Sequence, residues 1–83
     1  ALARPEDPAL AAAATAAFQS WEAPIAAALR EEGVGRKDAE TFAGLVVSTV
    51  EGALVRARAA GDEAPLDSAV AGLRQALEAL LPG

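Results

Sequence analysis

The residues of this chain that could carry out chemistry are carboxylates, arginines and a few hydroxyl groups, because the sequence holds no histidine and no cysteine. Without these two residue types there are no thiol nucleophiles, no disulfide bonds, no imidazole acid–base groups and no zinc sites built on them. The sequence also has no glycine-rich phosphate loop and no Ser-His or Ser-Lys arrangement. We therefore expect no enzymatic activity, no cofactor and no metal site.

Glu51 and Arg58 are the charged pair with the most informative spacing. They are seven residues apart, so a helix places them on the same side, next to Val47 and Leu54. A charged group on a covered surface needs a partner. If this side is buried, we expect the two residues to pair across a two-fold axis or with the ends of neighbouring helices. A structural ion pair is favoured over a ligand site.

The three aromatic residues are Phe18, Trp21 and Phe42, and helical periodicity places each on an apolar face. Aromatic side chains inside a helical domain can line a pocket for an apolar ligand. More often they simply fill the core. The sequence by itself leaves both interpretations open.

Proline and glycine divide the chain into three segments of helical length, and no alternating β pattern competes with them. The apolar residues keep the same helical phase before and after Pro24, which predicts a kinked helix rather than two separate ones. We predict an all-α fold with helices over about residues 8–32, 37–60 and 65–81.

The second and third predicted helices each have one apolar face for their own core and a further face that remains uncovered. The remaining faces carry small residues at helical spacing, which would let another helix backbone approach closely. A symmetric dimer that joins two such helix pairs into a four-helix bundle covers both faces. The predicted dimer interface consists of Gly44, Ser48, Gly52, Val55, Ala69, Gly72, Ala76 and Ala79.

Composition also indicates a partner surface and excludes several classes of function. The chain has only 83 residues, and 24 of them are alanine, which buries little area, so a lone copy has a thin core. The net charge is −5 and the seven basic residues are scattered, which is unfavourable for binding nucleic acid directly. No apolar run is long enough to cross a membrane. We expect a soluble cytoplasmic protein.

A series of short sequence motifs lies within about residues 9 to 75. It comprises Phe18-Gln19-Ser20-Trp21, Leu29-Arg30-Glu31-Glu32-Gly33, Ala43-Gly44-Leu45-Val46-Val47-Ser48, Glu51-Gly52-Ala53-Leu54, Arg58-Ala59 and Pro65-Leu66-Asp67. In this order and spacing, the chain resembles the C-terminal regulatory domain of TetR-family transcriptional repressors, in the LmrA/YxaF-like branch.

The resemblance implies an all-helical domain that binds a small apolar effector and forms a homodimer through its last two helices. Effector binding in such regulators favours an arrangement in which the paired DNA-binding domains no longer match the operator half-sites. From their shared inward faces, we expect the pocket wall to include Trp21, Phe42, Val46 and Val50.

One departure from the family matters, because its members carry an N-terminal helix-turn-helix that reads operator DNA. We expect residues 1–83 to be a single domain from the C-terminal part of a longer regulator, lacking that module, so that operator DNA is contacted only through the missing part. The alternative is a stand-alone helical protein–protein interaction module without an effector. Whether the reading frame continues upstream into a helix-turn-helix distinguishes the two.

Overall fold

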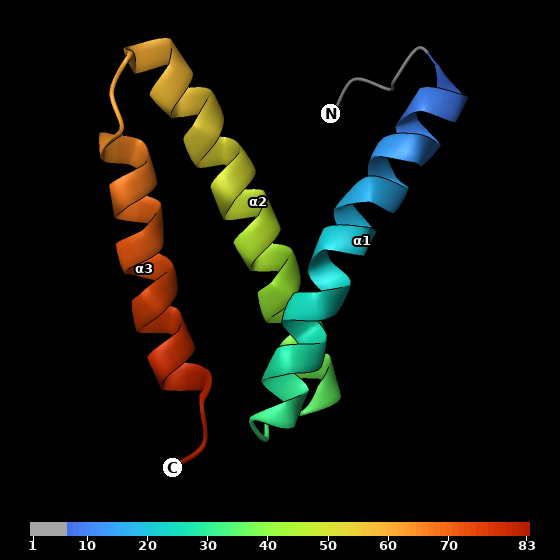
Figure 1. Ribbon diagram of the computed structural model, residues 1–83, viewed down its shortest axis with the longest axis vertical. Helices are drawn as coiled ribbons and strands as arrows, with labels where there is room; N and C mark the ends of the chain where they lie inside the picture. Colours follow the sequence, from blue (N-terminus) through green and yellow to red (C-terminus); the bar gives the residue numbers. More distant parts are fainter. Residues whose placement is uncertain (1–6) are drawn as a thin grey trace, which may run out of the picture.

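The computed structural model describes residues 7–83, which form three helices and no strand within that range. Helix α1 covers Pro8–Glu31, α2 covers Arg36–Ala60 and α3 covers Ala64–Leu80 (Figure 1). The predicted all-α fold is confirmed, and each predicted boundary lies within one residue of the observed one.

The ends of α1 show why the boundaries could be predicted. The Asp7 side chain caps the helix, because its Oδ1 accepts hydrogen bonds from the backbone N–H of Ala9 at 3.0 Å and of Leu10 at 3.2 Å. After the helix, Gly33 has a φ of 96°, and the N–H of Val34 donates to the carbonyl oxygen of Leu29 at 3.0 Å. This left-handed glycine with a returning hydrogen bond is a common way to end a helix.

Helix α1 continues through Pro24 without a break. A proline in a helix interior removes one backbone hydrogen bond and costs about 3 kcal/mol. In the turn before it, the Ser20 hydroxyl donates to the carbonyl oxygen of Ala17 at 2.6 Å. The proline therefore interrupts the hydrogen bonding of α1 locally and does not divide it into two helices.

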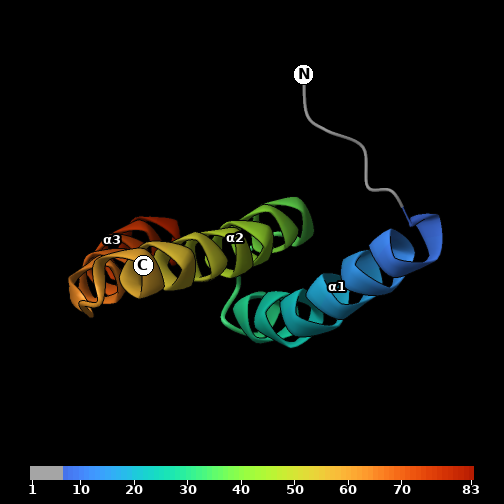
Figure 2. The same ribbon diagram turned by 90° about the horizontal axis from the view of Figure 1, so that it is seen from above.

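Helix α2 is the centre of the fold, because α1 and α3 both run against it, whereas the backbones of α1 and α3 do not come close to each other within the described residues. Figure 1 shows α3 antiparallel beside α2, while α1 crosses α2 near one end and then diverges. From above, α2 and α3 again lie together, with α1 at an angle to them (Figure 2). The radius of gyration is 14.8 Å, larger than the roughly 12 Å of a compact chain of this length. The fold is an open V.

The hydrophobic core lies at the closed end of the V. There Leu29 from α1, Val34 from the following turn, and Ala39 and Phe42 from α2 form a buried cluster. Leucines of α3 pack against this cluster from the other side; they are Leu73, Leu77 and Leu80. The end of α1, the start of α2 and the end of α3 thus share one core, and the opposite ends of the helices share none.

The first half of α1 lies outside this core. Leu10 is 67% exposed and Trp21 is 51% exposed, although helical periodicity places them on the same side as Leu29. Periodicity predicts that this whole side of α1, from Leu10 to Leu29, is core, and for the single chain that prediction is wrong at Leu10 and Trp21. Helix α1 diverges from α2 toward its start, which leaves Leu10 uncovered (Figure 1). Trp21 lies where α1 is still near α2, since Phe18 lines a pocket with Glu51, but its side of α1 is not the one that faces α2.

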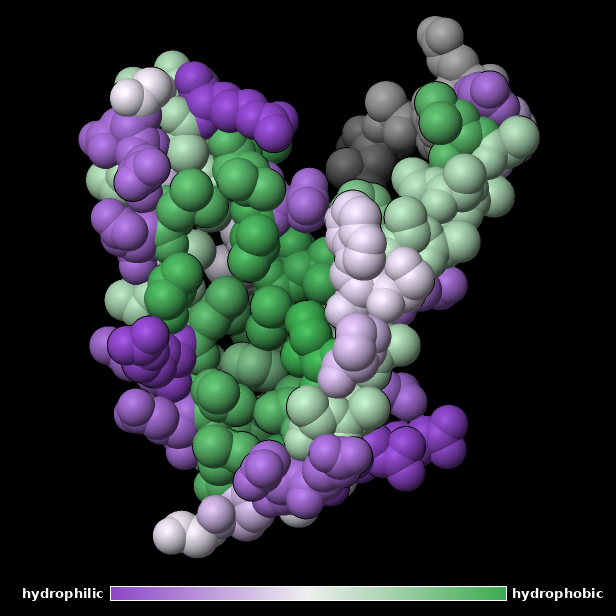
Figure 3. All heavy atoms as spheres, in the orientation of Figure 1, coloured by the Kyte–Doolittle hydropathy of each residue, from purple (hydrophilic) through white to green (hydrophobic). Residues whose placement is uncertain are grey.

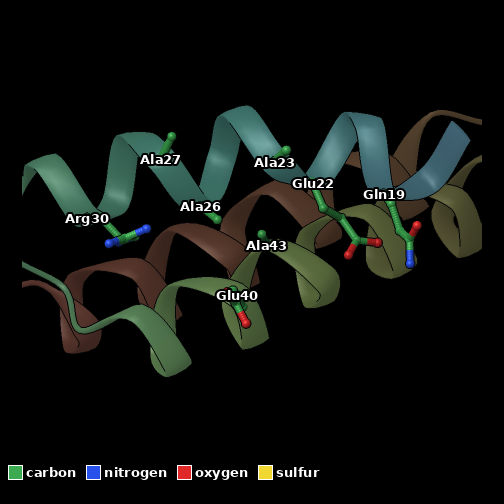
Figure 4. A pocket seen from close by; sticks show the side chains of 8 residues that line it. All are labelled: Gln19, Glu22, Ala23, Ala26, Ala27, Arg30, Glu40 and Ala43. Carbon is green, nitrogen blue, oxygen red and sulfur yellow. The ribbon is translucent and has the colours of Figure 1, made fainter. Parts of the chain in front are cut away.

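The contact between α1 and α2 depends on small residues. Ala43 is 0% exposed, and Ala26 of α1 points toward it at the crossing (Figure 4). We expect Ala43→Leu to destabilise the chain by about 1–3 kcal/mol, because the larger side chain forces the two helices apart. Urea unfolding followed by circular dichroism measures this. The matched control, Ala12→Leu on the exposed part of α1, should change stability by less than about 0.5 kcal/mol. Equal effects of the two substitutions would contradict the close contact.

Candidate functional site

An apolar groove runs between α2 and α3 on the side of the helix pair that faces the opening of the V. It has a volume of about 260 Å³. Its lining residues are Phe42, Val46, Val70, Leu73, Arg74 and Leu77, of which only Arg74 is polar. Figure 3 shows apolar side chains gathered over α2 and α3 in the recess beside α1. Val70 is 53% exposed, so part of this apolar surface is open to water in the single chain.

The groove contains two of the four residues predicted to form the pocket wall. Phe42 and Val46 lie side by side in it, and Val50 is half-buried one turn further along α2. Trp21 is not among the lining residues. It lies on α1 and makes an edge-to-face contact with Phe18, with ring centroids 5.3 Å apart and planes at 85°. A pocket that includes all four residues stays a prediction.

Sequence reasoning missed the contribution of α3 to this groove. Val70 and Leu77 belong to the leucine-rich stripe of the third helix, which periodicity assigns to the core, and Arg74 lies between them. At 100° per residue these three side chains share an arc of roughly 60°. The signal that could have found them is an arginine at the edge of an otherwise apolar stripe.

A second groove lies between the same two helices on their other side. Its volume is about 380 Å³, and Gly52, Arg56 and Pro65 are among its lining residues. A Cβ atom added at Gly52 or at Gly72 would meet no other atom within 4 Å. Val55 is 65% exposed. Gly52, Val55 and Gly72 of the predicted dimer interface are therefore uncovered in the single chain.

The remaining residues of the predicted interface are placed less uniformly. Gly44 is half-buried beside α1, and a Cβ atom added there would lie 3.7 Å from Oε1 of Glu22. Ala76 packs against the core cluster. Ser48 and Ala79 are exposed, whereas Ala69 is half-buried and lines the second groove. A second copy of the chain would therefore meet Gly52, Val55, Gly72 and Ala79 more readily than Gly44 or Ala76.

Glu51 and Arg58 form no ion pair within the chain. Seven residues of helix separate their Cα atoms by roughly 10.5 Å, so a direct contact would need both side chains fully extended toward each other. Over residues 7–83 the one ion pair is that between Arg36 Nε and Glu40 Oε1, at 3.2 Å on the surface. Glu51 is half-buried beside Phe18, while Arg58 is exposed. Their pairing across a two-fold axis stays a prediction.

A groove of about 430 Å³, lined by alanines and by four polar residues, lies between α1 and the start of α2 (Figure 4). Alanines line much of it, and Gln19 and Glu22 extend from α1 toward α2. Arg30 and Glu40 complete the polar lining, and Glu40 is engaged by Arg36. The part of the chain that the structure describes has no buried polar side-chain atom without a partner and no group of three or more potential metal ligands. This groove therefore offers no evident catalytic or metal-binding arrangement.

None of the helices within residues 7–83 combines the length and the apolar character that crossing a membrane requires. What the geometry offers instead is an apolar groove on one side of the α2–α3 pair and an open strip of small residues on the other.

Comparison with known proteins agrees with this description. The family model for the C-terminal domain of LmrA/YxaF-like transcriptional regulators matches residues 1–72. A search of the curated proteins and a search of the solved structures each found no match. Because the family model covers most of the chain, the resemblance noted in the sequence is confirmed: the chain belongs to the LmrA/YxaF-like family of TetR-type transcriptional regulator C-terminal domains.

Proposed function

We propose that this chain supplies the dimerisation and effector-sensing part of a TetR-family repressor, whose helix-turn-helix lies in a preceding part of the protein. Membership in the family of regulator C-terminal domains is the observation that carries the proposal. The two separate surfaces of the α2–α3 pair support it, since one suits a second helix pair and the other suits a small ligand.

Dimerisation is supported by the uncovered strip on α2 and α3. Gly52 and Gly72 leave the backbones of both helices accessible, and Val55 provides exposed apolar surface next to them. A second copy related by a two-fold axis would bring equivalent strips together and complete a four-helix bundle. Burying these residues would also compensate for a core that is confined to one end of the molecule.

Effector sensing is supported by the groove on the opposite side. Phe42 is anchored in the core, while Val46 and Val70 leave apolar surface open beside it. Trp21 and Val50 belong to the proposed wall as well, with Trp21 contributed by α1. A ligand in the opening of the V would then contact all three helices.

The arrangement of α2 suggests how the two surfaces are coupled. One side of α2 lines the apolar groove through Val46, and another carries Gly52 of the proposed interface. A ligand that favours one position of α2 relative to α3 therefore also favours one geometry of the dimer. In a repressor, that geometry sets the spacing of the DNA-binding domains against the operator half-sites.

The double substitution Gly52→Leu and Gly72→Leu tests the proposed interface. We expect it to weaken dimerisation at least tenfold, because two leucines per copy would hold the facing backbones apart; this corresponds to about 1.4 kcal/mol or more. Sedimentation equilibrium at micromolar concentrations measures the change. Helical content should persist, since neither added side chain meets another atom of its own chain near the Cβ position.

The matched control is Ala12→Leu, which adds the same side chain to the exposed part of α1, away from the proposed interface. It should leave the dimerisation constant unchanged. A wild-type chain that stays monomeric at tens of micromolar would contradict the dimer outright. Upstream sequence without a helix-turn-helix would instead favour the stand-alone interaction module.

Trp21 provides a test of the proposed effector pocket. In the regulator with its DNA-binding domain, an apolar ligand that releases operator DNA should shift the fluorescence emission of Trp21, because the ligand replaces water at its exposed ring face. Val50→Ser should weaken ligand binding several-fold by removing apolar contact. Operator release with unchanged Trp21 emission and unchanged affinity in Val50→Ser would contradict this pocket.

A further inference from the structure

The apolar groove between α2 and α3 has one charged lining residue, and it defines a class of ligand. We infer that the groove binds an apolar molecule ending in a carboxylate, with the carbon chain against Val46, Val70 and Leu77 and the carboxylate on Arg74. This inference rests on the proposed effector-sensing function and specifies the chemistry of its ligand.

The position of Arg74 on α3 supports the inference. It follows Val70 by four residues and precedes Leu77 by three, so its side chain starts from the same side of the helix as both groove residues. A guanidinium group offers several N–H donors in a plane that matches a carboxylate. The long aliphatic stem of arginine can also cover apolar surface while the charge stays in water. The groove thus has an apolar floor and a positive rim.

Arg74 has no competing partner in the described structure. The carboxylates nearest to it in helical register are Glu78, four residues further along α3, and Asp67, seven residues before it. Neither lies within ion-pair distance, because Arg36 and Glu40 form the one ion pair of residues 7–83. The guanidinium is therefore available to a ligand, and the two carboxylates limit how strongly it attracts an anion.

The groove and the proposed dimer interface do not compete for the same surface. At 100° per residue, Val70 and Leu77 lie roughly 140–180° around α3 from Gly72 and Ala79. The volume of about 260 Å³ is slightly below the roughly 300–1,000 Å³ of most ligand pockets. An elongated ligand therefore fits better than a bulky one, and its far end would continue along α2 toward Val50.

Decanoate and 1-decanol are suitable probes, because they share a carbon chain and differ in the charged end. Titration into the 83-residue chain, followed by the methyl NMR signals of Val70, Leu73 and Leu77, gives both the site and the affinity. We expect both probes to shift these signals. Arg74→Gln should weaken decanoate binding about fivefold, the upper range for one exposed ion pair, and leave decanol binding unchanged.

Matched variants separate a local role of Arg74 from general charge effects. Arg30→Gln removes an exposed arginine of α1, away from the apolar groove and from the proposed dimer interface, and should leave decanoate affinity unchanged. Arg74→Lys should restore part of the affinity by keeping the charge. Glu78→Gln should tighten decanoate binding by up to about twofold, because it removes a nearby negative charge.

Three outcomes would overturn the inference. They are equal decanoate affinity in wild type and Arg74→Gln, equal losses in Arg74→Gln and Arg30→Gln, and shifts confined to methyl groups outside the groove. These outcomes would not contradict the proposed function if the dimer forms and a neutral ligand releases operator DNA. Conversely, Arg74-dependent decanoate binding by a chain that does not dimerise would support the groove and contradict the repressor.

Discussion

The fold depends on the packing of both other helices against α2. Ala39 and Ala43 are fully buried and allow α1 to cross close to α2, while Phe42 on an adjacent side meets the leucines of α3. Because α1 and α3 meet α2 on different sides, they cannot also cover each other along their length. The open V and the core at one end are direct consequences of this arrangement (Figure 1).

This packing leaves the chain with little buried apolar volume. Of the seven buried hydrophobic residues within the described range 7–83, three are the alanines Ala39, Ala43 and Ala53, which add little hydrophobic stabilisation. The larger side chains Leu10, Leu45 and Val55 remain exposed. In a small chain that stabilisation must exceed the conformational entropy lost on folding. The exposed apolar faces are therefore where additional protein surface or ligand would contribute most.

The sequence predicts the helices well because their ends are determined locally. Asp7 supplies its own cap, and Gly33 and Gly61 adopt the left-handed conformation that ends α1 and α2. The direction of α1 could not be predicted in the same way. Periodicity assigns Leu10 and Trp21 to the side that carries Leu29, but whether that side is covered depends on how α1 lies against α2, which residue spacing does not specify.

The candidate site was predicted in part for the same reason. Phe42 and Val46 follow from the apolar face of α2, because a residue's side of its own helix is fixed by sequence spacing alone. Val70 and Arg74 do not, because they join the groove only through the way in which α3 is rotated against α2. Trp21 illustrates the opposite case, since spacing places it on the apolar side of α1 but does not show that this side is uncovered at its position.

The small residues on α2 and α3 have a consequence for the proposed coupling between ligand and dimer. Long side chains at an interface can change rotamer and absorb a shift of a few tenths of an ångström, whereas close backbone contact cannot. If the bundle packs through Gly52 and Gly72, a displacement of α2 caused by a ligand must appear as a change in the angle between the two copies. The residues that weaken each helix on its own would then be the ones that transmit the signal.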